Sequence, residues 1–300
     1  MEKMEMSTEC SSGTGCQTCS TAGSCSQEEK EKHAQSLINM AMGSIGKKFM
    51  VLSGKGGVGK SSVAVNLAAT LAARGKKVGI LDADIHGPNI PKMLGVEDKR
   101  PMAAPGPVDG MLPIAATDNL RVMSIGFFLD SKDSAVIWRG PMKHGLLKQF
   151  LGEVHWGELD YLIMDLPPGT GDEALSIAHL IGKVDGAVIV TTPQEVALLD
   201  SRKSISFCRE IKIPLIGVVE NMSGLLCPHC GKTIDLFKTG GGERIAREMK
   251  VPFLGRVPLD PLMVLCGDDG RPFVDTHPDS PVTTAFAGIV DAWERQLGSA

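Results

Sequence analysis

The stretch Ser53-Gly54-Lys55-Gly56-Gly57-Val58-Gly59-Lys60-Ser61-Ser62 is the feature around which the rest of the sequence is organised. From Gly54 to Ser61 it matches the pattern G-x-x-x-x-G-K-[ST], in which a glycine-rich loop leads from a buried strand into a helix. The flanking sequence provides both elements, because a short apolar run over 49–53 precedes the loop and a helical pattern over 61–74 follows it. The stretch therefore predicts an α/β fold with a phosphate-binding loop.

The residue types in this loop suit a nucleoside triphosphate with Mg²⁺, and ATP is the expected nucleotide. Glycines allow backbone N–H groups to turn toward phosphate oxygens, and the N-terminal end of the next helix adds partial positive charge. Lys60 is expected to reach the β- and γ-phosphates, and the Ser61 hydroxyl to bind Mg²⁺. A glycine-rich turn that binds nothing is the alternative. The expected nucleotide-binding residues of the loop are Gly54, Lys55, Gly56, Gly57, Val58, Gly59, Lys60, Ser61 and Ser62.

Apolar runs and helical patterns alternate along the chain, which predicts a doubly wound, mostly parallel sheet covered on both faces. The expected strands are 49–53, 78–82, 161–166, 187–191 and 215–220, with 253–257 as a further strand. The expected helices are 30–47, 61–74, 142–152, 172–182, 195–210 and 241–249, with 283–297 as a closing helix. Residues 97–120 hold several prolines and glycines and are expected to form a loop or hairpin insertion.

Composition excludes several classes of protein. The net charge of -4 and the pI of about 6.0 come without a basic stripe, so no nucleic-acid partner is expected. No apolar run reaches the roughly 18 residues that cross a bilayer, and no apolar signal core is present at the N-terminus. We therefore expect a cytoplasmic protein with no membrane partner. In that compartment eight cysteines indicate metal binding, catalysis or burial before disulfides.

The N-terminal segment differs from the rest of the chain. Residues 1–30 are rich in Ser, Thr, Gly, Glu and Cys and nearly free of aliphatic residues, so they cannot build a core of their own. We predict a flexible, cysteine-rich arm over 1–30. A short helical linker over 31–47 then leads into a P-loop ATPase domain over 48–300.

Lys55 is unusual, because one subunit does not need a second lysine at the start of the loop to hold phosphate. The loop resembles the deviant Walker-A class of ATPases, in which this lysine reaches across a dimer to the partner's nucleotide. The resemblance implies a homodimer in which Lys55 supplies charge in trans, as an arginine finger does. A solvated lysine at the mouth of the loop is the alternative.

Carboxylates at the ends of two other predicted strands complete the expected site. Asp165 ends an apolar strand, the Walker-B pattern, and can hold Mg²⁺ directly or through water. The loop over 166–172 follows it and is expected to sense the γ-phosphate. Asp84 resembles the residue that orients the attacking water in the same ATPase class, and Asn221 resembles its adenine-contacting asparagine. The alternatives are that Asp82 and Asp84 cap the next helix and that Asn221 forms a turn.

The pair Cys227 and Cys230 forms a C-x-x-C motif just after Asn221. Zinc sites and iron–sulfur clusters usually need four ligands, so two thiolates are half of a site. A symmetric dimer brings identical patches face to face, and two such pairs can then hold one cluster on the axis. Cys208 and Cys266 stand alone in helical or apolar patterns and are expected to be buried thiols.

Four motifs together resemble the Mrp/ApbC iron–sulfur cluster carriers, over roughly residues 45–290. They are Gly54-Lys55-Gly56-Gly57-Val58-Gly59-Lys60-Ser61, Asp82-Ala83-Asp84-Ile85-His86-Gly87-Pro88, Asp165-Leu166-Pro167-Pro168-Gly169-Thr170-Gly171-Asp172 and Cys227-Pro228-His229-Cys230. The resemblance implies ATP binding and hydrolysis and a homodimer. It also implies a labile [4Fe–4S] cluster, bridged by Cys227 and Cys230, for delivery to apo iron–sulfur proteins.

The arm supplies four more cysteines, Cys10, Cys16, Cys19 and Cys25, spaced C-x₅-C-x₂-C-x₅-C. Four nearby thiols can surround one iron–sulfur cluster. The arm resembles the N-terminal cluster site of the eukaryotic cytosolic branch of this family, from which it departs in the shorter gap between its first two cysteines. A zinc knot and an unliganded tail are the alternatives.

The sequence therefore predicts an ATP-dependent scaffold or carrier of iron–sulfur clusters, with Lys55, Lys60 and Asp84 as its catalytic residues. No general base is evident, and slow turnover is expected because positioning supplies most of the catalysis. A partitioning or positioning ATPase of the ParA/MinD type with a structural zinc site is the alternative. A reductase like the nitrogenase iron protein is a third possibility, but that relative uses separated single cysteines.

Overall fold

The computed structural model describes residues 26–105, 110–129, 140–227 and 229–298. Its centre is an eight-stranded sheet in the order β10-β7-β6-β1-β5-β2-β4-β3, parallel throughout except for the short β3 edge strand. The strands are β1 (Ile45–Leu52), β2 (Val78–Asp82), β3 (Ile114–Ala115), β4 (Leu120–Ser124), β5 (Leu159–Asp165), β6 (Gly186–Thr191), β7 (Leu215–Glu220) and β10 (Phe253–Arg256). A separate hairpin is formed by β8 (Leu225–Leu226) and β9 (Thr233–Ile234).

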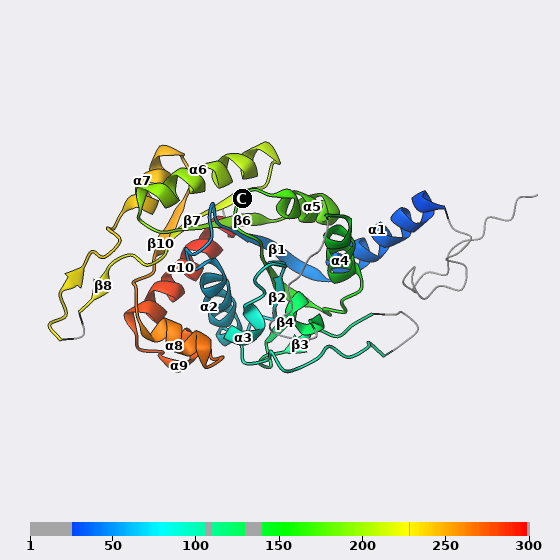
Figure 1. The fold of residues 1–300 in the computed structure, drawn as a ribbon, viewed down its shortest axis with the longest axis horizontal. Coiled ribbons are helices and arrows are strands. Elements are labelled where there is room, and N and C mark those ends of the chain that lie inside the picture. The colour runs from blue at the N-terminus through cyan, green and yellow to red at the C-terminus, as the bar shows by residue number, and fades with distance from the viewer. Residues whose placement is uncertain (1–25, 106–109, 130–139, 228, 299–300) are drawn as a thin grey trace, which may run out of the picture.

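Helices cover both faces of the sheet, which is why its central strands are continuous apolar runs. In Figure 1, α2 and α10 lie on one side of the sheet and α4 to α7 lie on the other. The helices are α1 (Gln27–Gly43), α2 (Lys60–Ala73), α3 (Ile90–Met93), α4 (Gly140–Gly152), α5 (Asp172–Ile181), α6 (Glu195–Glu210), α7 (Gly241–Glu248), α8 (Leu262–Asp268), α9 (Phe273–Thr276) and α10 (Pro281–Gly298), with a 3₁₀ turn, η1 (Ile125–Phe128). The predicted doubly wound α/β class is confirmed.

The strand order reverses direction at β1, which lies between β5 and β6. Ligands of open α/β sheets bind at such a point, beside the carboxyl ends of the strands. The register brings three strand ends together here, because Asp165 of β5 is level with both Val51 of β1 and Asp82 of β2. The topology thus gathers the glycine-rich loop and two carboxylates at one edge of the sheet.

The first helix differs from its expected bounds of 30–47. It begins after Ser26, whose side chain caps it in a reciprocal capping box with Glu29, and it ends at Gly43. Strand β1 then starts at Ile45, beside Leu159, so residues 45–47 are strand and not helix. The buried residues of α1 pack toward α4 and α5. The division of the chain into an arm, a linker and a domain stays a prediction, since residues 1–25 lie outside the described part.

The other predicted strands and helices are present within a few residues of their expected bounds. Strand β4 was not predicted. The insertion over 97–120 was expected to be a loop or hairpin, and it does end in a hairpin in which β3 pairs antiparallel with β4. Strand β4 also pairs in parallel with β2, so it belongs to the main sheet. Strand β4 is hard to recognise because exposed Arg121 interrupts its apolar residues. Helices α3, α8 and α9 are too short for a periodic pattern to reveal them.

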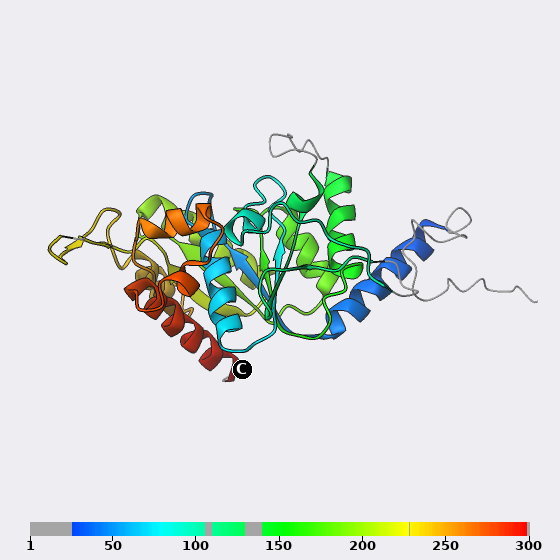
Figure 2. The ribbon, with the colours of Figure 1, turned by 90° about the horizontal axis from the view of Figure 1, so that it is seen from below.

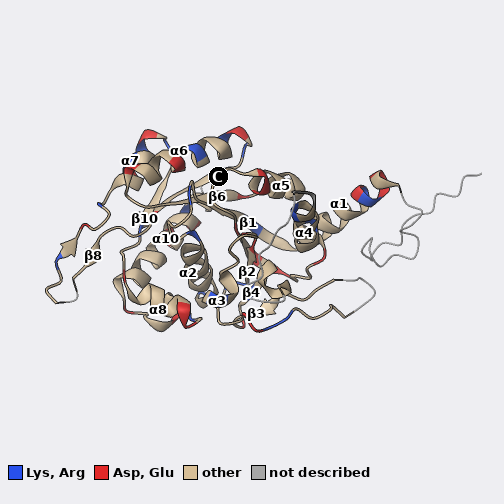
Figure 3. Cartoon of the chain, viewed as in Figure 1, with Lys and Arg blue, Asp and Glu red and all other residues tan. Residues whose placement is uncertain are grey.

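Two properties of the surface bear on function. Figure 3 shows basic and acidic residues interspersed along helices α6 and α7. Ion pairs join Arg244 to Glu195 and Arg202 to Glu248 across the two helices. In the described part of the chain, no helix combines the length and the apolar character that crossing a membrane requires.

Candidate functional site

The glycine-rich loop contains backbone conformations and close approaches that favour glycine. Gly57 and Gly59 have φ angles of 82° and 78°, which other residues adopt at a cost. A Cβ at Gly54 would lie 2.2 Å from the backbone carbon of Asp200, so α6 packs directly against the loop. The loop borders a pocket of about 210 Å³. The pocket is lined by Ser53, Lys55, Gly56, Gly57, Gly59, Lys60, Ser61, Ser62, Asp84, Asn89, Met93 and Pro168.

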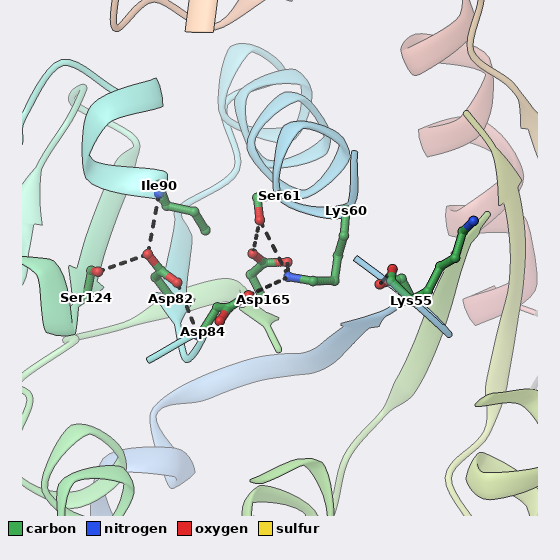
Figure 4. A network of polar contacts seen from close by, with 9 residues as sticks. Lys55, Lys60, Ser61, Asp82, Asp84, Ile90, Ser124 and Asp165 are labelled. Carbon is green, nitrogen blue, oxygen red and sulfur yellow. Dashed lines mark hydrogen bonds and ion pairs between the residues drawn. The ribbon is translucent and has the colours of Figure 1, made fainter. Parts of the chain in front are cut away.

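Lys60 and Ser61, at the start of α2, both converge on Asp165 (Figure 4). The Lys60 ammonium lies 2.7 Å from Oδ1 of Asp165, and the Ser61 hydroxyl donates to Oδ2 over 2.5 Å. Asp84 is a second carboxylate near the same cation, with Oδ2 4.0 Å from Nζ of Lys60. The residues expected to bind phosphate and Mg²⁺ are therefore brought together.

The carboxylates of Asp82, Asp84 and Asp165 outnumber the Lys60 cation beside them. Burial raises the pKa of Asp165 despite the opposing effect of Lys60. Burial, and then the charge of Asp165, raise the pKa of Asp82 to about 8. A hydroxyl beside carboxylate oxygens is a donor set that suits Mg²⁺, which takes one or two carboxylates and completes its shell with water and phosphate. The residues present thus fit a bound Mg²⁺ at Ser61 and Asp165.

Asp82 has a structural task that the sequence only partly indicated. One carboxylate oxygen accepts from the backbone N–H of Asp84 over 3.2 Å. The other accepts from the Ser124 hydroxyl over 2.9 Å and from the N–H of Ile90, the first residue of α3, over 3.4 Å. Asp82 therefore holds both ends of the loop that carries Asp84, which includes the helix contact expected of a capping residue.

Lys55 behaves differently from Lys60. Figure 4 shows its side chain pointing away from the Lys60–Asp165 pair. Among the described residues, no carboxylate forms an ion pair with it. Lys55 is half-buried and is one of the residues that line the pocket.

Asn221 follows β7 and lies against the glycine-rich loop. Its side-chain amide donates to the carbonyl of Val58 over 2.9 Å, and a Cβ at Gly59 would lie 2.3 Å from the same nitrogen. The alternative of a simple turn residue does not account for this contact. Asn221 therefore holds the glycine-rich loop against the end of β7, and its contact with adenine stays a prediction.

Sequence reasoning missed a connection between the two loops that border the pocket. The Lys143 ammonium of α4 lies 2.8 Å from Nε2 of His86 and 3.0 Å from Oε1 of Glu173. His86 belongs to the loop of Asp84, and Glu173 follows the loop of Pro168. Burial is the largest single effect on Glu173 and opposes its ionisation, but the hydrogen bond from Lys143, a backbone hydrogen bond and the charges of Lys143 and His86 together lower the pKa of Glu173. Lys143 belongs to no motif, so only the fold could reveal it.

Cys227 and Cys230 lie on the turn of the β8–β9 hairpin. The turn is closed by hydrogen bonds from the Gly231 N–H to the Cys227 carbonyl and from the Cys227 N–H to Lys232. Cys227 is half-buried and Cys230 is exposed. Hydrogen bonds from the backbone of His229 and Cys230, and from the Cys230 thiol, lower the pKa of Cys227, which favours the thiolate that binds metal.

The remaining described cysteines, Cys208 and Cys266, are buried as predicted. Burial raises the pKa of Cys208 to about 12, so it stays an inert thiol. In the described part of the chain no group of three or more His, Cys, Asp or Glu side chains could hold a metal ion. One copy of the hairpin therefore offers two ligands. The predicted ligands Cys10, Cys16, Cys19 and Cys25 lie outside the described residues.

The hairpin and α1 lie at opposite ends of the molecule in both Figure 1 and Figure 2. The pocket lies between them, at the end of β1. Within one chain, therefore, the hairpin is remote from the point where the N-terminal segment enters the fold.

Known proteins resemble this chain over most of its length. An iron–sulfur cluster carrier protein of Methanocaldococcus jannaschii is 54% identical over 260 residues, which cover 86% of this chain and 89% of the relative. One from Saccharolobus solfataricus is 51% identical, covering 85% of each chain. A nucleotide-binding protein of Archaeoglobus fulgidus, solved with ADP, is 40% identical with a TM-score of 0.70, covering 79% of this chain and 91% of its own.

The cell-division ATPase MinD of Pyrococcus furiosus shares the fold, with a TM-score of 0.56 at 22% identity over 83% of this chain and 99% of its own. The family model described as ParA, the NUBPL iron-transfer P-loop NTPases, matches residues 44–293. The glycine-rich loop, the converging Asp165 and the hairpin cysteines all lie within that match. This chain belongs to the family of NUBPL-type iron-transfer P-loop NTPases.

Proposed function

We propose that this chain is an ATP-dependent carrier that assembles an iron–sulfur cluster between two copies of itself and delivers it to apo iron–sulfur proteins. The observation that carries the proposal is the hairpin turn, where Cys227 and Cys230 present two thiols at the surface of a P-loop NTPase. Its family and its close relatives, which are named iron–sulfur cluster carriers, support the same function. They favour it over a partitioning ATPase with a structural zinc site.

The nucleotide half of the proposal rests on the contacts around Asp165. ATP binds with its phosphates in the glycine-rich loop, Lys60 turns from Asp165 toward the β- and γ-phosphates, and Ser61 and Asp165 hold Mg²⁺. Mg²⁺ held by Ser61 and Asp165 would neutralise charge that develops on the phosphates. Asp84 orients the attacking water, and Asn221 contacts the adenine. No described residue is placed as a strong general base, so hydrolysis is slow.

The cluster half rests on the number of ligands. A [4Fe–4S] cluster takes four thiolates, and one hairpin provides Cys227 and Cys230. A two-fold axis through the turn supplies the second pair from an identical hairpin. The lowered pKa of Cys227 supports thiolate ligation. Cys10, Cys16, Cys19 and Cys25 form a separate cluster site on the N-terminal arm.

The dimer also gives Lys55 a role. Its side chain points away from its own Lys60–Asp165 pair, so it is available to a nucleotide in the partner copy. There it supplies positive charge as the γ-phosphate departs, the task of an arginine finger. ATP binding thus closes the same interface that holds the cluster. We propose a cytoplasmic location and no nucleic-acid or membrane partner, which the mixed charge on α6 and α7 supports.

A transfer assay tests this function. Full-length protein is loaded with iron and sulfide under anaerobic conditions and mixed with an apo [4Fe–4S] hydratase, whose activity reports the cluster it receives. Loaded wild type should restore the activity, whereas Cys227→Ser and Cys230→Ser should restore less of it, since only the proposed cluster on the arm remains. The buried Cys208→Ser variant is the matched control and should transfer as wild type does. Equal transfer by the Cys227→Ser protein would contradict the assignment of the hairpin.

A further inference from the structure

Glu220, the last residue of β7, is a fully buried carboxylate that the proposed chemistry does not use. It is 0% exposed. Its Oε1 accepts from the Ser223 hydroxyl over 2.5 Å and from the Gly240 N–H over 2.8 Å, while its Oε2 accepts from the Gly242 N–H over 2.5 Å. Arg256 lies 3.5 Å away and also pairs with Glu243. A carboxylate satisfied by three donors is held firmly in place.

These donors are the two ends of one excursion of the chain. After β7 the chain leaves the sheet, forms the β8–β9 hairpin with its two cysteines, and returns at α7. Ser223 lies where the excursion starts, and Gly240 lies where it ends. The returning chain packs closely against Glu220, because a Cβ at Gly242 would lie 2.9 Å from the Cβ of Glu220. One carboxylate therefore fastens both ends of the cysteine hairpin to the sheet.

The neighbouring residue connects the same point to the nucleotide loop. Asn221 donates through its side chain to the Val58 carbonyl over 2.9 Å and through its backbone to Thr191 over 2.8 Å. A displacement of Val58 when phosphates fill the loop acts directly on Asn221. The adjacent Glu220 cannot shift without stretching its hydrogen bonds to the base of the hairpin.

We infer that Glu220 is a positioning residue that couples nucleotide binding to the geometry of the cysteine hairpin. The inference rests on the proposed function, because it assumes that the hairpin holds a cluster. It assigns a second role to the end of β7, in which Asn221 senses the nucleotide and Glu220 transmits the change. Coupling of this kind requires a contiguous set of contacts, and here the contacts run from Val58 to Ser223 and Gly240.

The test uses full-length protein loaded with iron and sulfide, and measures the rate of cluster loss to an iron chelator with and without Mg·ATP. We expect the two rates of wild type to differ by about fivefold or more, the lower end of typical coupling between sites. Glu220→Gln replaces one acceptor oxygen by a donor NH₂ facing backbone N–H groups or Ser223. The ratio should then fall toward one, while the Kd for ATP stays within about twofold of wild type.

Two further variants keep the test decisive. Glu243→Gln is the matched control, because it removes an exposed carboxylate from the same Arg256 without touching the hairpin, and its ratio should equal that of wild type. Ser223→Ala removes a single donor and should lower the ratio even where Glu220→Gln fails to fold. A wild-type ratio in Ser223→Ala and Glu220→Gln alike would overturn the inference and leave the proposed function standing.

A measurement without iron separates the two claims. In cluster-free protein, hydrogen exchange of the amides over 223–240 should slow in wild type when a non-hydrolysable ATP analogue binds. The effect should be lost in Glu220→Gln. Failure of wild type to hold iron at Cys227 and Cys230 would sink the proposed function, whereas unchanged exchange in the presence of the analogue would sink the coupling.

Discussion

Lys60 is expected to stabilise the fold as well as to bind phosphate. Its side chain is 7% exposed, and its ammonium lies 2.7 Å from Oδ1 of Asp165, whose side chain is 0% exposed. Removing one partner of a buried ion pair leaves the other charge without compensation and costs about 3–5 kcal/mol. We therefore expect Lys60→Met to lower the free energy of unfolding of the nucleotide-free protein by about 3–5 kcal/mol at pH 8.

The same reasoning fixes a dependence on pH. Burial already raises the pKa of Asp165, and loss of Lys60 removes the main opposing effect and raises it further. A folded-state pKa above the unfolded value means that the folded state binds the extra proton, so stability falls as pH rises through that window. Each pH unit below the folded pKa recovers about 1.4 kcal/mol, so most of the cost of Lys60→Met should be gone at pH 5.5.

Urea unfolding at pH 8 and pH 5.5, in EDTA and without nucleotide, measures both effects. Lys203→Met is the matched control. Its side chain is 73% exposed and its ion pair with Asp200 is a surface contact, so its free energy of unfolding should change by about 0.5 kcal/mol or less. A Lys60→Met protein within about 1 kcal/mol of wild type at pH 8, or equally destabilised at both pH values, would refute the buried-pair argument.

Three further predictions follow from contacts around the pocket. Gly59→Ala should lower the free energy of unfolding by at least about 1–2 kcal/mol, because residue 59 has a positive φ. The added Cβ also collides with the Asn221 side chain, which holds the loop. Isothermal titration should therefore detect no ATP binding by a variant that still melts cooperatively. Burial and a neighbouring carboxylate raise the pKa of Asp82 to about 8, so wild-type stability should fall as pH rises from about 4 to 8, and Asp82→Asn should flatten that slope in thermal melts. Lys143→Met should lower kcat for ATP hydrolysis with little change in KM, because Lys143 links Glu173 to His86 in the loop of Asp84. Lys143→Arg should restore part of the rate, and equal kinetics of Lys143→Met and wild type would refute this role.

Much of the pocket could be predicted because its residues are encoded locally. The glycine-rich loop fixes a strand, a turn and a helix in one stretch, and parallel strands must end at the same edge of the sheet. Asp84 and Asp165 could therefore be placed near Lys60 before any coordinates were known. The hairpin cysteines followed from their spacing alone.

Other features depend on contacts between distant segments, which no local pattern encodes. Glu220 reads as the last residue of an apolar strand, and its importance appears only when Gly240 and Gly242 return to it. Lys143 is an ordinary helical lysine until the fold brings His86 beside it. The end of α1 was placed too late because strand β1 extends back to Ile45 through pairing with β5, which the apolar pattern of residues 49–53 does not include.

The central claim is that Cys227 and Cys230 hold an iron–sulfur cluster between two chains. Iron, acid-labile sulfide and zinc should be quantified in anaerobically purified full-length protein whose arm cysteines, 10, 16, 19 and 25, are changed to serine. We predict about two iron and two sulfide per chain in a dimer, no zinc, and complete loss of iron when Cys227→Ser is added. Zinc in place of iron, or an iron content that Cys227→Ser does not change, would contradict the account.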